Sequence, residues 1–235
     1  MSGPRSYPNP ALASLRGRTD IQTSMPYYRF WRTMCRLFIP AYLKTRVFNR
    51  HYEPTCGSAV YICNHQSFMD PMLMAFGLSR PMNFMARSSL FRVAGFRQLI
   101  MSVHAFPVER DLMGLSGLKE AMRRMRGGGQ VVVFAEGTRT SDGRIGQLLP
   151  GVALLAQRAA DWTVPVLIDG AFEAWPRTKL LPSMGNVVIQ YDKPIPQAAA
   201  RSMDPRQFVR MVRDRLIAMQ ADVRRRVGRP ELRYD

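Results

Sequence analysis

Acidic side chains are scarce in this sequence: it holds 17 Asp and Glu against 34 Lys and Arg, for a formal net charge of +17. A basic excess of this size predicts a polyanionic partner, which means nucleic acid, an anionic membrane surface, or a phosphorylated or CoA-linked substrate. Lysine is also rare, because 30 of the 34 cations are Arg. The planar guanidinium suits phosphate better than an ammonium does, although genome composition can give the same ratio. The net charge itself still calls for an anionic partner.

Cysteine and long hydrophobic runs are scarce as well. The three cysteines, Cys35, Cys56 and Cys63, form no C-x-x-C pair and are too few for a metal framework. Two of them lie in apolar runs, so we expect buried free thiols in a reducing compartment. No stretch of 18 or more apolar residues is present, and the polar first 20 residues lack the core of a signal peptide. These absences argue against a spanning helix and leave binding at a membrane surface open.

Strand-like and helical patterns alternate along most of the chain, whose 235 residues are 46% hydrophobic and 22% charged. This length and composition suit one globular α/β domain and argue against extended disorder. Strands are predicted at 59–63, 82–86, 105–108, 131–134, 164–168 and 187–191, and helices at 71–78, 90–101, 112–126, 151–160 and 204–226. Such alternation is typical of a mostly parallel central sheet flanked by helices on both faces.

The first 50 residues divide into two parts ahead of a main domain expected over 51–235. Residues 1–24 are predicted to be a flexible tail, and residues 25–50 an amphipathic segment with no acidic residue between Ile21 and Tyr52. An apolar stripe between cations is typical of a helix lying in a membrane interface. The alternative is a helix packed on the protein's own core. Pro40 is expected to kink this segment or split it into two short helices. The stripe consists of Phe30, Trp31, Met34, Leu37 and Phe38.

The last predicted helix begins at Asp204-Pro205, where Asp is a favoured N-cap and proline a favoured first helical residue. Its apolar residues have the spacing of a helix that packs on a core. Seven arginines between 206 and 226 are either a solvated face or an added attraction to a membrane.

One His and one Asp stand close together after the first predicted strand. His65 follows that strand directly, and ligands bind at the carboxyl ends of strands in open α/β sheets. Asp70 comes five residues later and precedes Pro71, which is a helix-start signal. A carboxylate has several acceptor positions, so we expect Asp70 to cap the following helix while it also orients the imidazole. This spacing alone is common by chance.

Two further predicted strands also end in charged residues. The run Phe106-Pro107-Val108-Glu109-Arg110 ends one, and Phe134-Ala135-Glu136-Gly137-Thr138-Arg139 ends the other. Gly137 permits a tight turn, Thr138 can donate to an anion and Arg139 can bind one. Glu136 can orient Arg139 or the polar head of an acceptor. Ordinary surface ion pairs are the alternative for Arg110 and Glu136, but three charged strand ends on one sheet favour a site.

These runs together resemble a known family. The set Asn64-His65-x-x-x-x-Asp70, Phe106-Pro107-Val108-x-Arg110, Phe134 to Arg139 and Val164-Pro165-Val166 is similar to the four ordered blocks of the glycerophospholipid acyltransferases, whose best-known members acylate lysophosphatidic acid. The resemblance covers roughly residues 58–170. Two positions depart from the family: Ala135 stands where a proline is usual, and Ser102-Val103-His104-Ala105 lacks the glycine usual before Phe106.

The resemblance implies a glycerol-3-phosphate acyltransferase-like fold and a mechanism. His65, oriented by Asp70, would be the general base on the acceptor hydroxyl, which attacks the thioester of acyl-CoA or acyl-carrier protein. Such assistance typically supplies about 10²–10⁴-fold in rate. The expected acceptor is lysophosphatidic acid, giving phosphatidic acid at the cytoplasmic face of an anionic membrane. No metal and no resident cofactor are implied. Asn64 supports the first block, and the acceptor would be bound by Arg110, Glu136, Gly137, Thr138 and Arg139.

Rival functions have weaker support in the sequence. A nucleic-acid-binding module predicts a binding motif or clustered basic and aromatic residues, and the arginines are instead spread along the chain. A serine or thiol hydrolase needs a nucleophile elbow such as G-x-S-x-G, which is absent. A protein that binds lipid without catalysis is disfavoured by the intact His65, Asp70, Glu136 and Arg139. Another lysolipid or lipid-linked acceptor stays an alternative.

Overall fold

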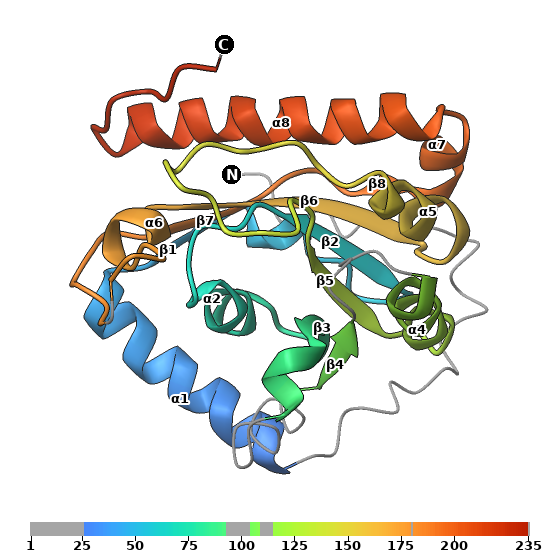
Figure 1. Ribbon diagram of the computed structural model, residues 1–235, viewed down its shortest axis with the longest axis horizontal. Coiled ribbons are helices and arrows are strands. Elements are labelled where there is room, and N and C mark those ends of the chain that lie inside the picture. Colours follow the sequence, from blue (N-terminus) through green and yellow to red (C-terminus); the bar gives the residue numbers. More distant parts are fainter. Residues whose placement is uncertain (1–25, 93–103, 109–114, 180, 235) are drawn as a thin grey trace, which may run out of the picture.

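The computed structural model describes residues 26–92, 104–108, 115–179 and 181–234. Their strands form an eight-stranded sheet in the order β1-β7-β6-β2-β5-β3-β4, with β8 beside β6 (Figure 1). The strands are β1 (Arg46–Phe48), β2 (Ala59–Cys63), β3 (Met82–Arg87), β4 (Ala105–Val108), β5 (Gln130–Phe134), β6 (Trp162–Asp169), β7 (Val188–Tyr191) and β8 (Ile195–Pro196). The helices are α1 (Pro26–Leu43), α2 (Asp70–Gly77), α4 (Leu115–Arg126), α5 (Gly151–Arg158), α6 (Ala171–Ala174), α7 (Gln197–Arg201) and α8 (Pro205–Arg226), with short 3-10 helices η2 (Arg50–Tyr52) and η3 (Ser88–Arg92).

The fully buried strand β2 lies between two parallel neighbours, β5 and β6. Cys63 is in register with Phe134 of β5 and with Val166 of β6, so the carboxyl ends of these three strands lie along one edge. The sheet is mixed rather than wholly parallel, because β7 and β8 both run antiparallel to β6. The expected mostly parallel sheet flanked by helices is confirmed, and its parallel centre brings the charged strand ends together.

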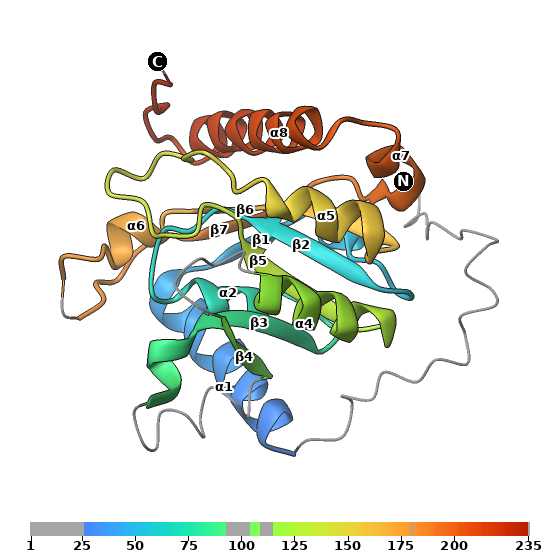
Figure 2. The ribbon, with the colours of Figure 1, turned by 45° about the vertical axis from the view of Figure 1, so that its right-hand side comes forward.

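Helices cover both faces of the sheet, and β2 shows how its sequence divides between them. Val60 and Ile62 pack into the core beneath α4, α5 and α8, while Tyr61 and Cys63 pack into the core beneath α1, α2 and α6. This alternation follows from the two-residue period of a strand, which turns successive side chains to opposite faces. Figure 2 shows the two helical layers, with α8 and α5 on one side of the sheet and α1 and α2 on the other.

The N-terminal segment differs from the prediction in two ways. α1 is one helix that continues through Pro40, and residues 46–48 form β1, parallel to β7, rather than more helix. Pro40 lies three residues before the last helical residue, Leu43, so its missing N–H removes one hydrogen bond close to the helix end. The split into two short helices expected at Pro40 is therefore wrong.

Most other predicted elements are confirmed within a few residues. The helix predicted at 90–101 and the tail predicted at 1–24 fall largely or wholly outside the described residues, and residues 88–92 form η3. All three cysteines are free thiols, but Cys63 alone is buried, with Cys35 half-buried and Cys56 exposed. Of the two cysteines in apolar runs that were expected to be buried, Cys63 is buried and Cys35 is not fully so.

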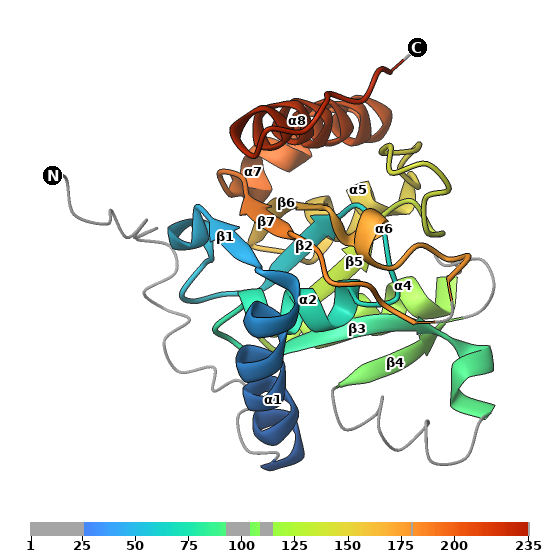
Figure 3. The same ribbon diagram turned by 90° about the vertical axis from the view of Figure 1, so that its left-hand side faces the viewer.

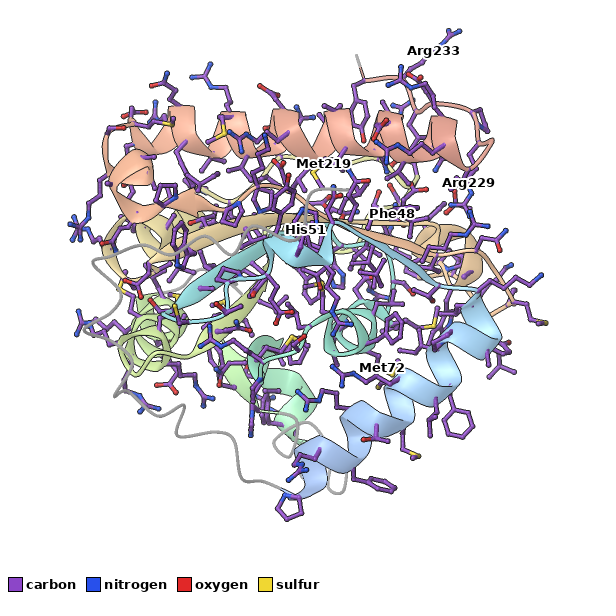
Figure 4. The ribbon with its side chains drawn as sticks, turned by 180° about the vertical axis from the view of Figure 1, so that it is seen from behind. Phe48, His51, Met72, Met219, Arg229 and Arg233 are labelled. Carbon is purple, nitrogen blue, oxygen red and sulfur yellow. The ribbon has the colours of Figure 1, made fainter. Side chains whose placement is uncertain are left out.

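The C-terminal helix α8 begins as its sequence predicts. The Asp204 side chain accepts hydrogen bonds from the backbone of Arg206 at 2.9 Å and of Gln207 at 3.3 Å, and Pro205 is the first helical residue. The apolar stripe packs on the sheet, and Figure 4 shows Met219 on the side of α8 that faces it. Within the described ranges, no helix is both long and apolar enough to cross a membrane.

Candidate active site

His65 and Asp70 meet in the loop between β2 and α2. The imidazole Nδ1 lies 2.6 Å from Oδ2 of Asp70, and that carboxylate is completely buried. The same oxygen accepts hydrogen bonds from the backbone N–H groups of Gln66 at 2.6 Å and Ser67 at 2.8 Å. These donors precede α2, and the Asp70 side chain makes no capping bond to the helix. The expected helix cap is therefore wrong, because Oδ2 stabilises the loop that carries His65.

The imidazole is supported on one face and partly open. The ring of Phe134, at the end of β5, stacks on it with centroids 4.4 Å apart and planes 19° apart. One fifth of the His65 side chain is exposed. Among the described residues, no group bonds the second ring nitrogen, Nε2. The ring is thus fixed through Nδ1 and its face, while Nε2 is left for a proton of another molecule.

The third charged strand end holds the backbone of His65 from both sides. Glu136 accepts a hydrogen bond from the His65 backbone N–H through Oε1 and one from Gly146 through Oε2, each at 2.8 Å. The His65 carbonyl accepts from the backbone N–H of Thr140 at 2.8 Å. Burial raises the pKa of Glu136, against the opposing effect of these two donors. Both oxygens of Glu136 thus bind backbone amides, a role that was not among the two predicted for it, orienting Arg139 or the polar head of an acceptor.

Asn64 joins the ends of β2 and β6. Its side-chain amide donates to the carbonyl of Ile168 and accepts from the N–H of the same residue, both at 2.8 Å. Asn64 is almost fully buried, so this pair extends the β2–β6 ladder by one side chain. The residue before the candidate base is thereby fixed to a neighbouring strand.

The remaining predicted residues that the structure describes follow Glu136 in the loop after β5. Gly137 has φ 72°, the left-handed region, and its N–H bonds the carbonyl of Phe134 at 3.1 Å in a tight turn. Thr138 is exposed. The guanidinium of Arg139 lies 3.4 Å from the ring centre of Phe68, which is itself half exposed. Arg110 lies outside the described residues.

Sequence reasoning assigned no role to Gln66, although it is fully buried in the same loop. Its side chain donates to the carbonyl of Gly143 at 3.1 Å and accepts from the N–H of Phe172 at 3.2 Å. The carbonyl of Gly143 also accepts from Gln220 of α8 at 3.0 Å, so α8 and the His65 loop bind the same carbonyl group. The available sequence signal was its position directly after His65, in the loop that follows a buried strand.

Sequence reasoning also missed the polar cluster at the end of β6. Asp169 is fully buried and binds Arg224 at 3.0 Å and Arg229 at 2.9 Å, and Figure 4 shows Arg229 near the C-terminal end of α8. The hydroxyl of Tyr234 bonds Gln220 and accepts from the N–H of Ile145 at 3.0 Å. The end of the chain is thereby fixed to the loop behind the candidate site. Asp169 directly follows an apolar strand, which is the signal that marked the other strand ends.

The two departures from the family pattern have clear local structures. The N–H of Ala135 donates to the carbonyl of Cys63 at 3.0 Å, a bond that a proline could not make. His104 has φ 62°, the left-handed conformation that glycine adopts without strain. The backbone at this position therefore has the conformation that favours glycine, although the residue is histidine.

No group of three or more His, Cys, Asp or Glu side chains within the described ranges is arranged to hold a metal ion. What is assembled is a partly exposed imidazole fixed by a buried carboxylate, with Arg139 on the ring of Phe68, a residue of the same loop as the imidazole. This arrangement suits proton removal from a hydroxyl group next to an anion.

Comparisons with known proteins agree with this chemistry. The sequence model of the acyltransferase family matches residues 44–169. The 1-acyl-sn-glycerol-3-phosphate acyltransferase of Bacillus subtilis (strain 168) is 25% identical over 209 residues, which cover 88% of this chain and 98% of that protein. The chloroplastic enzyme LPAT1 of Arabidopsis thaliana is 29% identical over 140 residues, which cover 58% of this chain and 39% of that protein.

A solved structure has the same fold. The crystal structure of the 1-acyl-sn-glycerophosphate acyltransferase PlsC from Thermotoga maritima superposes with a TM-score of 0.68 and 22% sequence identity, covering 83% of this chain and 80% of that one. At this level of identity the likeness concerns the fold.

Proposed function

Since the chain belongs to the acyltransferase family, we propose that it transfers a fatty acyl group to the free hydroxyl of 1-acyl-sn-glycerol-3-phosphate, giving phosphatidic acid. The relatives named for this reaction, one of them matched over nearly its whole length, support the choice of acceptor. The observation that carries the proposal is the 2.6 Å contact between the His65 imidazole and the buried Asp70 carboxylate. Another lysolipid is the alternative acceptor.

In the proposed mechanism, His65 is the general base. Asp70 holds the proton on Nδ1, so Nε2 has a free lone pair and takes the proton of the acceptor hydroxyl as its oxygen attacks the thioester carbonyl. The buried carboxylate stabilises the imidazolium that forms. The tetrahedral intermediate then collapses, the carbon–sulfur bond breaks, and the imidazolium returns the proton to the thiolate. An ester and a free thiol result, and His65 is again neutral.

The proposed acceptor site surrounds this base. Arg139, Thr138 and the Gly137 turn would receive the phosphate, with Arg110 from the second block. Glu136 would act through the His65 backbone, because both of its oxygens bind backbone amides. The guanidinium of Arg139 above the half-exposed Phe68 ring supports an anion site next to an apolar surface.

The donor and the location complete the proposal. The acyl group would come from acyl-CoA or acyl-carrier protein as co-substrate, with no resident cofactor or metal. The protein would work peripherally at the cytoplasmic face of an anionic membrane, through α1. In support, α1 packs one side on the fold through Ile39 and Leu43 and exposes Phe30, Leu37 and Phe38 on the other. The sequence left core packing and binding at a membrane interface as alternatives for this segment. The packed side of α1 suits the first, and its exposed apolar side suits the second.

The test is acyl transfer from labelled acyl-CoA to lysophosphatidic acid by the wild type and by His65→Ala. We expect His65→Ala to lower kcat by about 10²–10⁴-fold, since it removes the general base. His51→Ala is the matched control, because His51 is exposed in η2 and should leave activity unchanged. A wild type inactive toward every lysolipid and donor tried, or full activity in His65→Ala, would overturn the proposal.

A further inference from the structure

The exposed large apolar side chains of the described residues are confined to three segments. Monomeric proteins rarely expose contiguous apolar surface unless it binds something. The eight side chains, which we call the apolar rim, are 41–73% exposed, and the fully described helices α5, α7 and α8 contribute none of them. They are Phe30, Leu37, Phe38 and Tyr42 in α1, Phe68 and Met72 at the start of α2, and Leu181 and Met184 after α6.

The three segments of the apolar rim contact one another. The Tyr42 hydroxyl of α1 donates to the carbonyl of Pro182 at 2.9 Å, which joins α1 to the chain after α6. The rings of Phe68 and Trp175 lie 5.5 Å apart, which joins the start of α2 to the end of α6. α1 also packs directly on α2. In Figure 3 α1, α2 and α6 lie below α8, and their core residues belong to the face of the sheet opposite to it.

Residues 175–179 and 181–186, the α6–β7 segment, contribute the most exposed part of the rim. Leu181 is 73% exposed and Met184 67%, more than any other member of the rim. The base of the segment is fixed, because Ser183 N–H bonds the carbonyl of Ala174 at 2.8 Å and the Trp175 indole bonds that of Lys179 at 3.0 Å. Two apolar side chains are therefore held outward on an ordered base, which reduces the entropy lost when they bind.

Cations surround these apolar side chains. Arg177 and Lys179 are exposed in the α6–β7 segment, and exposed cations accompany the rim along α1 and β1. Apolar side chains set among cations match the boundary between acyl chains and anionic headgroups. The cations of α1, of β1 and of the turn between them are Arg29, Arg36, Lys44 and Arg46.

We propose that the α6–β7 segment is a second membrane-binding element, in which Leu181 and Met184 insert into an anionic bilayer while α1 lies on it. This inference rests on the proposed function for the membrane itself and adds the second contact. Phe68, which carries Arg139 on its ring, belongs to the same rim. The arginines of α8 lie over the opposite face of the sheet and take no part.

The test is flotation with vesicles of phosphatidylglycerol and phosphatidylcholine, using the full chain with Leu181→Ser and Met184→Ser together. We expect the variant to partition roughly 10- to 100-fold less, because two exposed apolar side chains no longer enter the bilayer. Leu181→Met with Met184→Leu is the matched control, which keeps the apolar area and should bind like the wild type. Vesicles of phosphatidylcholine alone should bind the wild type less, since the cations lose their partners.

Further arms separate the outcomes. The α1 variant, Leu37→Ser with Phe38→Ser, should also lose binding; if it alone does so, the second contact is wrong while the role of α1 stands. Unchanged flotation of the serine variant at Leu181 and Met184 overturns the inference. A wild type that is dimeric by light scattering, with that variant monomeric, also overturns it, because a second copy would then cover the rim. The Leu181→Ser, Met184→Ser variant should still acylate a soluble short-chain acceptor. Flotation measures membrane binding whether or not the protein is active.

Discussion

Replacing Asp70 with Asn removes a buried negative charge beside the His65 imidazole and leaves the side-chain volume almost unchanged. Oδ2 of Asp70 accepts from His65, Gln66 and Ser67 at 2.6–2.8 Å. Oδ1 is buried and has no hydrogen-bond partner within the described part of the chain. The Asn amide keeps the three contacts only if its oxygen takes the Oδ2 position. Its NH2 group then occupies a buried position without an acceptor.

The size of the effect follows from these contacts. A buried donor without a partner costs about 1–3 kcal/mol of unfolding free energy, and the loss of charge weakens the bonds to the two backbone donors by about 1 kcal/mol each. We expect Asp70→Asn to lower the unfolding free energy by about 3–5 kcal/mol. The imidazolium formed during catalysis loses about 1.5–3 kcal/mol of stabilisation, which corresponds to about a 10- to 100-fold lower kcat.

The assay combines steady-state acyl transfer with urea unfolding followed by circular dichroism. The KM for the acceptor should change little, because the Asp70 side chain is completely buried and acts through the imidazole. A double-mutant cycle supplies the control: in the His65→Ala background, Asp70→Asn should cause no further loss of kcat. Wild-type kcat in the folded Asp70→Asn variant, or an equal loss in both backgrounds, would refute the assignment of this pair.

Two further predictions concern the loop after β5. Gly137→Ala places a β-carbon at φ 72°, so we expect the unfolding free energy to fall by about 1–2 kcal/mol; an unchanged midpoint of urea unfolding would contradict this. Burial raises the pKa of Glu136, so the folded state binds this proton more tightly than the unfolded state does. Protonated Glu136 therefore adds to the free energy of unfolding at pH values below its unfolded-state pKa. This contribution is lost as the pH rises through the folded-state pKa. The stability of the wild type relative to Glu136→Gln should therefore decrease as the pH rises above the ordinary glutamate pKa of 4.5. A constant or increasing difference would exclude this explanation.

The regular elements could be read from the sequence because their patterns reflect local rules. The five residues of β2 are all apolar, and their flanks end the strand, so both of its bounds were predicted. Asp204 and Pro205 marked the start of α8 through capping chemistry that acts within one helical turn. The meeting of His65 with Asp70 was likewise predictable, because five residues of loop are enough to join them.

What could not be read depends on partners far away in the chain. β1 forms because Arg46 to Phe48 find β7, more than 130 residues later, and no local pattern indicates that pairing. Which oxygen of Asp70 binds which donor depends on the path of the loop, and one oxygen serves both the imidazole and two backbone amides. The sequence offered Glu136 two roles, orienting Arg139 or the polar head of an acceptor, whereas its bonds to the backbone amides of His65 and Gly146 depend on how the loop folds.

The contacts of the last described residues also set an order in time. A ribosome makes the chain from its N-terminal end, so His65 and Asp70 emerge long before Arg229 and Tyr234. Until then Asp169 lacks one of its two guanidinium partners, and the loop behind the imidazole lacks its hydroxyl contact at Ile145. The contacts behind the proposed base are therefore completed only after residues 229–234 have been translated, long after His65 and Asp70 have left the ribosome.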